Sequence, residues 1–164
     1  MKTFTFHLQK ILDLKEKERE QAEWAFGKSL QKKAEEEAKL INLTRHREEV
    51  SHTLYEMQNQ PCSVSQLIEG NRYQQAVERA IQTQRQTLYG CELEVEDRKQ
   101  KLTSRMQESK LWEKMREQAK ERFDHAQRQM EQKELDEIGI SRYTMQQTSR
   151  TSKAAEKVSA PPLS

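Results

Sequence analysis

The stretch Gln58-Asn59-Gln60-Pro61-Cys62-Ser63 divides this chain, because it holds the only proline before Pro161. Proline lacks a backbone N–H and its ring clashes with the preceding turn, so a helix does not easily continue through it. Ser63-Val64-Ser65-Gln66 follows with the pattern of a capping box, in which Ser63 is the N-cap and Gln66 reaches back. The sequence therefore predicts one helix that ends near Gln58 and a second that begins near Ser63. A bend this short favours antiparallel neighbours.

The composition excludes a large hydrophobic core. Of 164 residues, 33% are hydrophobic and 34% are charged. Such a chain is either a long helical coiled coil or disordered. The nearly balanced charge, 29 basic against 27 acidic residues, favours the coiled coil.

The net charge of +2 comes from the end of the chain, where Arg150, Lys153 and Lys157 against Glu156 give 3 − 1 = +2. The rest of the chain is neutral, which argues against a nucleic-acid partner. The longest apolar run is Trp24-Ala25-Phe26, so we expect neither a membrane span nor a signal peptide. Two cysteines, Cys62 and Cys91, do not make a disulfide framework and fit a reducing cytosolic setting.

Apolar residues before the bend follow helical spacing. Thr3 and Thr5 are candidate N-caps for a helix over about 4–58. The predicted apolar stripe is weak and steps by four in its middle, and it tightens to a heptad pattern toward the bend. Its members are Leu8, Ile11, Leu12, Ala22, Phe26, Leu30, Ala34, Ala38, Leu40, Ile41, Leu43, Arg47, Val50, Leu54 and Met57.

The second helix is predicted over about 64–145 and is the longer of the two. Gly70-Asn71 indicates a kink or a short separate first helix. A regular heptad follows, comprising Val77, Ile81, Gln84, Leu88, Cys91, Val95, Arg98 and Leu102. After a predicted phase slip near Met106 the pattern resumes at Trp112, and Gly139 fits the end of the helix.

The predicted fold is all-α: a long antiparallel two-helix coiled coil over residues 1–146, with a bend at 59–63 and a disordered tail over 147–164. Folding back at Pro61 pairs residues whose numbers sum to about 121, so Leu30 faces Cys91 and Phe4 faces Glu117. In this register Gln118 to about Ile138 has no partner within the chain. Its stripe of Phe123, Ala126, Met130, Leu135 and Ile138 predicts a binding surface, for a partner or for a second copy.

No catalytic or cofactor-binding pattern is present. The histidines His7, His46, His52 and His125 lack the spacing of a metal site, and no glycine-rich phosphate loop occurs. A two-helix hairpin also offers no concavity that could converge catalytic groups. We therefore expect no enzyme activity, no cofactor and no metal.

Several stretches resemble the bacterial flagellar export protein FliJ family. They are residues 4–18 (FTFHLQKILDLKEKE), Val64-Ser65-Gln66 followed by Tyr73-Gln74-Gln75, residues 112–117 (WEKMRE) and residues 132–138 (QKELDEI). The resemblance covers about residues 3–146. It implies a cytoplasmic stalk of the flagellar type III export apparatus, peripheral to the inner face of the cell membrane at the flagellar base. Flagellum assembly, motility and chemotaxis would then depend on it.

The resemblance also implies partners: the hexameric export ATPase, the cytoplasmic domain of the export gate protein and export chaperones, with no nucleic acid and no membrane insertion. The residues predicted to meet the ATPase are Leu8, Ile11, Leu12, Trp112, Phe123, Met130 and Leu135. Those predicted for the gate are Leu43, His46, Val50, Tyr73 and Gln74.

Four alternatives stay open at this point. They are the stalk protein of a virulence-type III secretion system, a generic coiled-coil scaffold, a nucleic-acid-binding arm and a homodimeric cytoskeletal rod. The neutral body disfavours the arm, and the proline bend disfavours the rod.

Overall fold

In the computed structural model, which describes residues 3–159, the chain forms two helices, α1 (Gln9–Gln58) and α2 (Val64–Val158). No strand occurs in that range. The predicted all-α hairpin with a longer second helix is confirmed. Contacts divide the chain into a unit over Leu8–Trp112 and a second unit that joins Met1–His7 to Glu113–Ser164.

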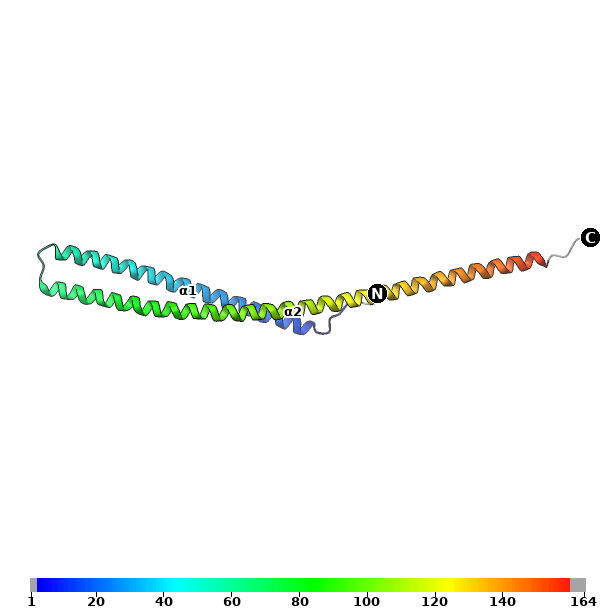
Figure 1. Ribbon diagram of the computed structural model, residues 1–164, viewed down its shortest axis with the longest axis horizontal. Helices are drawn as coiled ribbons and strands as arrows, with labels where there is room; N and C mark the ends of the chain where they lie inside the picture. The colour runs from blue at the N-terminus through cyan, green and yellow to red at the C-terminus, as the bar shows by residue number, and fades with distance from the viewer. Residues whose placement is uncertain (1–2, 160–164) are drawn as a thin grey trace, which may run out of the picture. The chain divides into compact units, whose positions relative to one another are not determined.

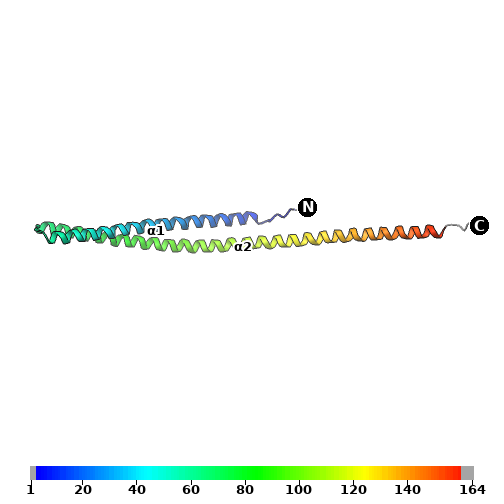
Figure 2. The same cartoon turned by 90° about the horizontal axis from the view of Figure 1, so that it is seen from above.

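Within the unit over 8–112, α1 lies alongside the first part of α2 (Figures 1 and 2). The bend between them has the predicted position, since α1 ends at Gln58 and α2 begins at Val64. The predicted capping box is also present. The Ser63 N–H donates to Gln66 Oε1 and the Gln66 N–H donates to Ser63 Oγ, each over 3.3 Å. These bonds satisfy two donors that the first helical turn leaves unpaired.

The other helix ends differ from the prediction. α1 begins at Gln9 instead of about residue 4, and its N-cap Leu8 makes no side-chain capping bond. Residues 3–6 have no regular secondary structure. α2 continues through Gly139 to Val158, past its predicted end near 145, so residues 147–158 are helical where a disordered tail was predicted. The remainder of that predicted tail, 160–164, lies outside the described residues.

The helices of the hairpin meet along a regular heptad seam. On α1 the buried and half-buried seam positions alternate by three and four residues: Leu12, Lys15, Arg19, Ala22, Phe26, Ser29, Lys33, Glu36, Leu40, Leu43, Arg47, Val50, Leu54 and Met57. On α2 they are Leu67, Gly70, Gln74, Val77, Ile81, Gln84, Leu88, Cys91, Val95, Arg98, Leu102, Arg105, Ser109 and Trp112. The predicted α2 heptad from Val77 to Leu102 is therefore confirmed.

The middle of the α1 stripe was predicted wrongly. Leu30, which was expected to face Cys91, is 43% exposed, whereas its neighbour Ser29 is only 4% exposed. Ala34, Ala38 and Ile41 are exposed as well. An unbroken heptad requires Ser29, Lys33 and Glu36 at the interface, although their side chains are polar. The predicted phase slip near Met106 is also wrong, because the seam of α2 continues through Arg105 and Ser109.

Gly70 allows the helices to approach closely near the bend. The predicted kink or separate helix is absent, because α2 runs through Gly70 without interruption. A Cβ placed on Gly70 would collide with Leu54 Cδ2, whereas one placed on Gly27 or Gly90 would meet nothing within 4 Å. Gly70 is thus required for packing in the seam, where Leu54 is only 9% exposed.

Polar side chains fix the register of the hairpin from end to end. Lys15 Nζ lies 3.1 Å from Glu108 Oε2, which gives a residue-number sum of 123. Arg47 and Glu78 form an ion pair of 3.6 Å, and their residue numbers sum to 125. Gln84 donates a hydrogen bond to the Glu36 carboxylate, and these residue numbers sum to 120. The predicted sum of about 121 lies within this range.

In the second unit, Phe4 contacts Phe123 instead of the predicted Glu117. The prediction assumed that Phe4 is helical, with a rise of about 1.5 Å per residue. Extended chain advances about 3.3 Å per residue, so residues 3–6 reach further along α2 than a helix would. Phe6 is also buried, at 9% exposure.

Candidate partner-binding surfaces

The residues predicted for the gate lie close together near the bend. His46 Nε2 and Tyr73 Oη share a hydrogen bond of 2.6 Å, and the two rings meet edge to face with centroids 5.8 Å apart. Gln74 Nε2 donates to Ser51 Oγ over 3.2 Å. Tyr73 remains 52% exposed. This end of the hairpin therefore presents an aromatic ring held in place by contact with α1.

Leu43 and Val50 have a different role from Tyr73. Both are half-buried members of the α1 seam. They contribute to hairpin packing, so only their outer edges are accessible to a partner. Of the five predicted gate residues, Tyr73 is the one that the structure leaves exposed.

The residues predicted for the ATPase are divided between the two units. Leu8, Ile11, Leu12 and Trp112 belong to the hairpin, and Phe123, Met130 and Leu135 belong to the second unit. In the hairpin, Leu12 is 1% exposed and is therefore a core residue. Leu8 and Trp112 are half-buried, and Ile11 lies at the edge of the seam.

Next to Leu12 a cluster of four charged side chains links the two helices. Lys15 Nζ lies 3.1 Å from Glu108 and 3.3 Å from Glu18, and Arg105 Nη1 lies 3.0 Å from Glu18 and 3.4 Å from Glu108. The hydrogen bond from Lys15 lowers the pKa of the Glu108 carboxyl. The same bond, with a second to Glu18, raises the pKa of Lys15. Because the cluster is partly exposed, it contributes little to the stability of the hairpin, and its main effect is to specify the register between α1 and α2.

A second polar contact crosses the middle of the seam. Gln84 Nε2 donates to both the carboxylate and the backbone carbonyl of Glu36, and Lys39 Nζ lies 2.9 Å from the same carboxylate. The hydrogen bond from Lys39, followed by that from Gln84, lowers the pKa of Glu36. The apolar stripe predicted from the sequence did not include Glu36.

The second unit presents an apolar surface along α2. Phe123 packs against Phe4, with ring centroids 5.5 Å apart. Beyond it, Met130 is 59% exposed and Leu135 is 64% exposed. Ile138, Ile140, Tyr143 and Met145 are exposed too. Met130, Leu135 and Ile138 lie within an arc of about 140° on α2 at 3.6 residues per turn, and we call these three residues the distal surface.

Sequence reasoning did not assign Ile140, Tyr143 and Met145 to the apolar stripe, because it took Ile138 and Gly139 for a possible last turn, although the predicted helix extended to about residue 145. A glycine inside a helix costs only about 1 kcal/mol relative to alanine and does not end the helix by itself. Neither proline nor glycine follows until Pro161, and that absence was the signal for continuation.

Among residues 3–159 no group of three or more His, Cys, Asp or Glu side chains is placed to hold a metal ion. No helix in the same range is long and apolar enough to cross a membrane. The surfaces described above present exposed aliphatic and aromatic side chains.

Comparison with known proteins places the chain in a family. The family model described as "Flagellar FliJ protein" matches residues 4–148. A similar solved structure is that of a chain described as a YscO homolog, CT670 from Chlamydia trachomatis, with a TM-score of 0.52 and 18% identity. The match covers 89% of this chain and 99% of the other, and at this identity it concerns the fold alone. No curated protein matches the chain. The chain belongs to the flagellar FliJ protein family.

Proposed function

We propose that this chain is the stalk-like coiled coil of a flagellar type III protein export apparatus, which engages the export ATPase and the export gate to promote protein export and flagellum assembly. Family membership over residues 4–148 is the observation that carries the proposal. It is non-enzymatic in this role and acts in the cytoplasm beside the membrane at the flagellar base. Its partners would be the hexameric ATPase, the cytoplasmic domain of the gate protein and export chaperones.

The distal surface supports a partner at the second unit. A two-helix hairpin covers its apolar side chains with its own second helix, but Met130 and Leu135 are 59% and 64% exposed. An exposed, isolated helix gains little from such residues, because most helical stability in proteins comes from packing an apolar face. We assign Met130 and Leu135, with Ile138, to contact with the ATPase.

Tyr73 supports a partner at the bend. Its contact with His46 orients the ring, while about half of its surface remains accessible. We assign Tyr73 and His46, flanked by Gln74, to contact with the gate. Oriented aromatic side chains are frequent anchors of protein interfaces, because they bury a large area at little cost in side-chain entropy.

The stalk of a virulence-type III secretion system is the alternative, favoured by the similarity to a YscO homolog. That similarity has 18% identity and concerns the fold. The family match favours the flagellar assignment. Binding to the flagellar ATPase but not to a virulence-type ATPase is the outcome that separates the two.

The test mixes the purified full chain with its cognate export ATPase and measures ATP hydrolysis and hexamer formation. We expect stimulation by the wild-type chain and its loss in Leu135→Glu, because a charge cannot be buried unpaired in an apolar contact. Leu93→Glu is the matched control, since Leu93 is 55% exposed on the hairpin part of α2. A chain that neither binds nor stimulates the ATPase contradicts the proposal.

A further inference from the structure

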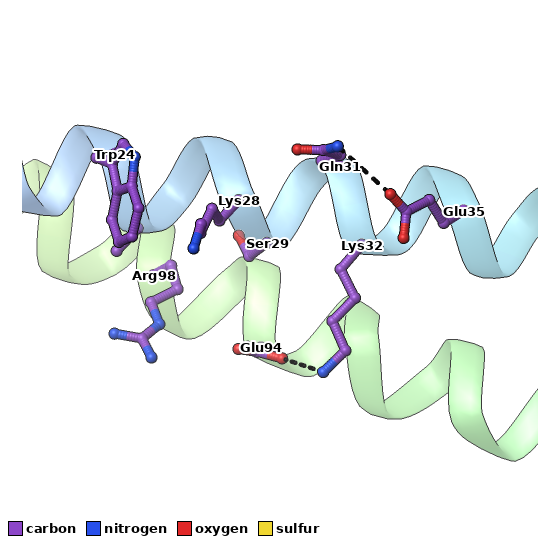
Figure 3. A pocket seen from close by; sticks show the side chains of 9 residues that line it. Trp24, Lys28, Ser29, Gln31, Lys32, Glu35, Glu94 and Arg98 are labelled. Carbon is purple, nitrogen blue, oxygen red and sulfur yellow. Dashed lines mark hydrogen bonds and ion pairs between the residues drawn. The ribbon is translucent and has the colours of Figure 1, made fainter.

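A groove on the hairpin surface is formed by residues of both helices (Figure 3). It has a volume of about 490 Å³. Trp24, Lys28 and Lys32 line it from α1, and Glu94 and Arg98 line it from α2. Ser29, a buried seam residue, forms part of its lining, so the groove follows the junction between the helices.

Trp24 contributes little to the stability of the hairpin. It lies outside the heptad seam and is 64% exposed, although its neighbours Ala25 and Phe26 are half-buried. Lys28 Nζ lies 4.0 Å from the centroid of the Trp24 ring. This cation–π contact holds the lysine over the indole without covering the rest of the ring. A large aromatic side chain is thus presented to solvent beside a positive charge.

The cations of the groove are incompletely neutralised. Within residues 3–159, neither Lys28 nor Arg98 has a carboxylate partner. Lys32 pairs with Glu94 over 3.5 Å, and both side chains are exposed. An exposed ion pair of this kind contributes little to stability, so Lys32 can readily exchange Glu94 for another carboxylate. The groove therefore offers two free cations and one loosely held cation around an exposed indole.

We propose that this groove docks an acidic peptide segment of a protein partner. An apolar side chain of the segment packs on Trp24, and a carboxylate of the segment is bound between Lys28 and Arg98. Charge-assisted hydrogen bonds to an ammonium and a guanidinium fit a carboxylate, and the indole supplies the apolar anchor. This proposal does not depend on the function assigned above, which concerns the distal surface and Tyr73.

A nucleic acid fits the groove less well than a peptide. Its phosphates are evenly spaced along a continuous backbone, and binding it requires an uninterrupted row of cations. The groove instead contains Glu35 and Glu94 beside its cations. A peptide can place a single carboxylate between Lys28 and Arg98 and leave neutral residues opposite the two glutamates.

The experiment titrates the full chain into a fluorescently labelled peptide of about ten residues that alternates glutamate with leucine, and follows anisotropy. A second peptide carries lysine in place of each glutamate. We expect saturable binding of the acidic peptide that weakens as salt is raised, and at least about tenfold weaker binding of the lysine peptide. Lack of saturation at millimolar protein, or equal binding of both peptides, overturns the proposal.

Two pairs of variants locate the binding. Trp24→Ala should weaken binding by about tenfold or more, and Lys28→Gln by about threefold to tenfold. Tyr89→Ala and Lys99→Gln are the matched controls, since Tyr89 is 62% exposed and Lys99 is also exposed. All four positions lie outside the seam, so melting temperatures should remain unchanged. Equal losses in Trp24→Ala and Tyr89→Ala overturn the proposal.

Two further results would assign the groove to another occupant and so overturn the proposal. One is tighter binding of a single-stranded oligonucleotide than of the acidic peptide. The other is a change in the sedimentation of the chain alone caused by Trp24→Ala, which would identify a second copy as the occupant. Trp24→Ala should still stimulate the export ATPase, so failure of this proposal and failure of the stalk function are distinguishable.

Discussion

Phe4 packs against Phe123 with ring centroids 5.5 Å apart and ring planes inclined at 54°. The contact joins the non-helical start of the chain to α2 within one unit. It also covers one apolar residue of α2 that would otherwise be available to a partner. The part of α2 that the chain leaves uncovered therefore begins beyond Phe123, and not at Gln118 as the heptad register alone predicted.

Phe4→Ala should release the first residues from α2. An aromatic pair contributes about 0.5–1.5 kcal/mol beyond its buried area, so amide exchange over residues 4–8 should accelerate up to about tenfold. Hydrogen exchange measured by mass spectrometry reports the change. Thr5→Ala is the control, because Thr5 is exposed. Unchanged exchange in Phe4→Ala would show that the contact does not hold the segment.

Gly70→Ala should destabilise the hairpin by about 1–3 kcal/mol, because its Cβ would collide with the buried Leu54. Gly90→Ala should instead stabilise by about 0.5–1 kcal/mol, since its Cβ meets nothing within 4 Å and alanine favours the helix. Urea unfolding followed by circular dichroism compares the two. In a Leu54→Ala background, Gly70→Ala should become stabilising. Stabilisation by Gly70→Ala in the wild-type background contradicts this account.

The hairpin should lose stability as pH falls below the ordinary carboxyl pKa of 4.5, because hydrogen bonds lower the pKa of Glu36 and Glu108 in the folded chain. The unfolded chain then binds protons first, so stability is complete above that pH and is lost as pH falls through the lowered pKa. Melting temperatures between pH 7 and pH 3 measure the loss. Glu108→Gln should reduce the pH dependence, whereas Glu121→Gln, an exposed control, should preserve it. If melting temperature falls equally with pH in both variants, the loss of stability does not come from Glu108.

Lys15 gives the complementary effect at alkaline pH. Hydrogen bonds to Glu108 and Glu18 raise its pKa above 10.5. The contribution of Lys15 to the stability of the hairpin is therefore complete below pH 10.5 and is lost as the pH rises through the raised pKa. The Glu108→Gln variant should weaken this dependence too, since it removes the carboxylate that contributes most to the shift.

Ser109→Ala should stabilise the hairpin by about 1 kcal/mol. Ser109 is 0% exposed, and its Oγ has no hydrogen-bond partner in the part of the chain that the structure describes. A buried hydroxyl without a partner costs about 1–3 kcal/mol, which the alanine removes. Ser29→Ala is the matched variant, because the buried Ser29 Oγ donates to the Phe26 carbonyl over 2.7 Å. Thermal unfolding should show a smaller gain for Ser29→Ala than for Ser109→Ala, and the reverse order contradicts the explanation.

Local sequence predicted the features that depend on local physics. Proline cannot donate a backbone hydrogen bond, so Pro61 marked the bend, and Ser63 with Gln66 marked the helix that follows. The heptad from Val77 to Leu102 was predictable because most of its members are apolar. The positions of polar seam residues such as Ser29, Glu36 and Ser109 were not predictable, because their side chains give no hydropathy signal.

The candidate surfaces were predicted only in part. Met130 and Leu135 were identified from apolar spacing, and the structure leaves both exposed. Leu12 was proposed on the same grounds, yet at 1% exposure it belongs to the core. Spacing places a residue on a helix face, but it does not show whether another helix covers that face. The groove at Trp24 was also invisible in the sequence, because its residues come from positions far apart along the chain.

The sequence alone determined that this chain is an antiparallel helical hairpin with its bend at Pro61 and a longer second helix, because capping, proline geometry and heptad spacing act over a few residues. The tertiary structure decided where α1 begins, which polar side chains occupy the seam, and that Phe4 reaches Phe123. Those outcomes depend on contacts between residues up to 119 positions apart, from 123 − 4, and on the heptad remaining continuous along both helices. A polar residue enters such an interface when its neighbours in the heptad hold the register, whether a partner side chain satisfies it, as Gln84 does for Glu36, or not, as at Ser109.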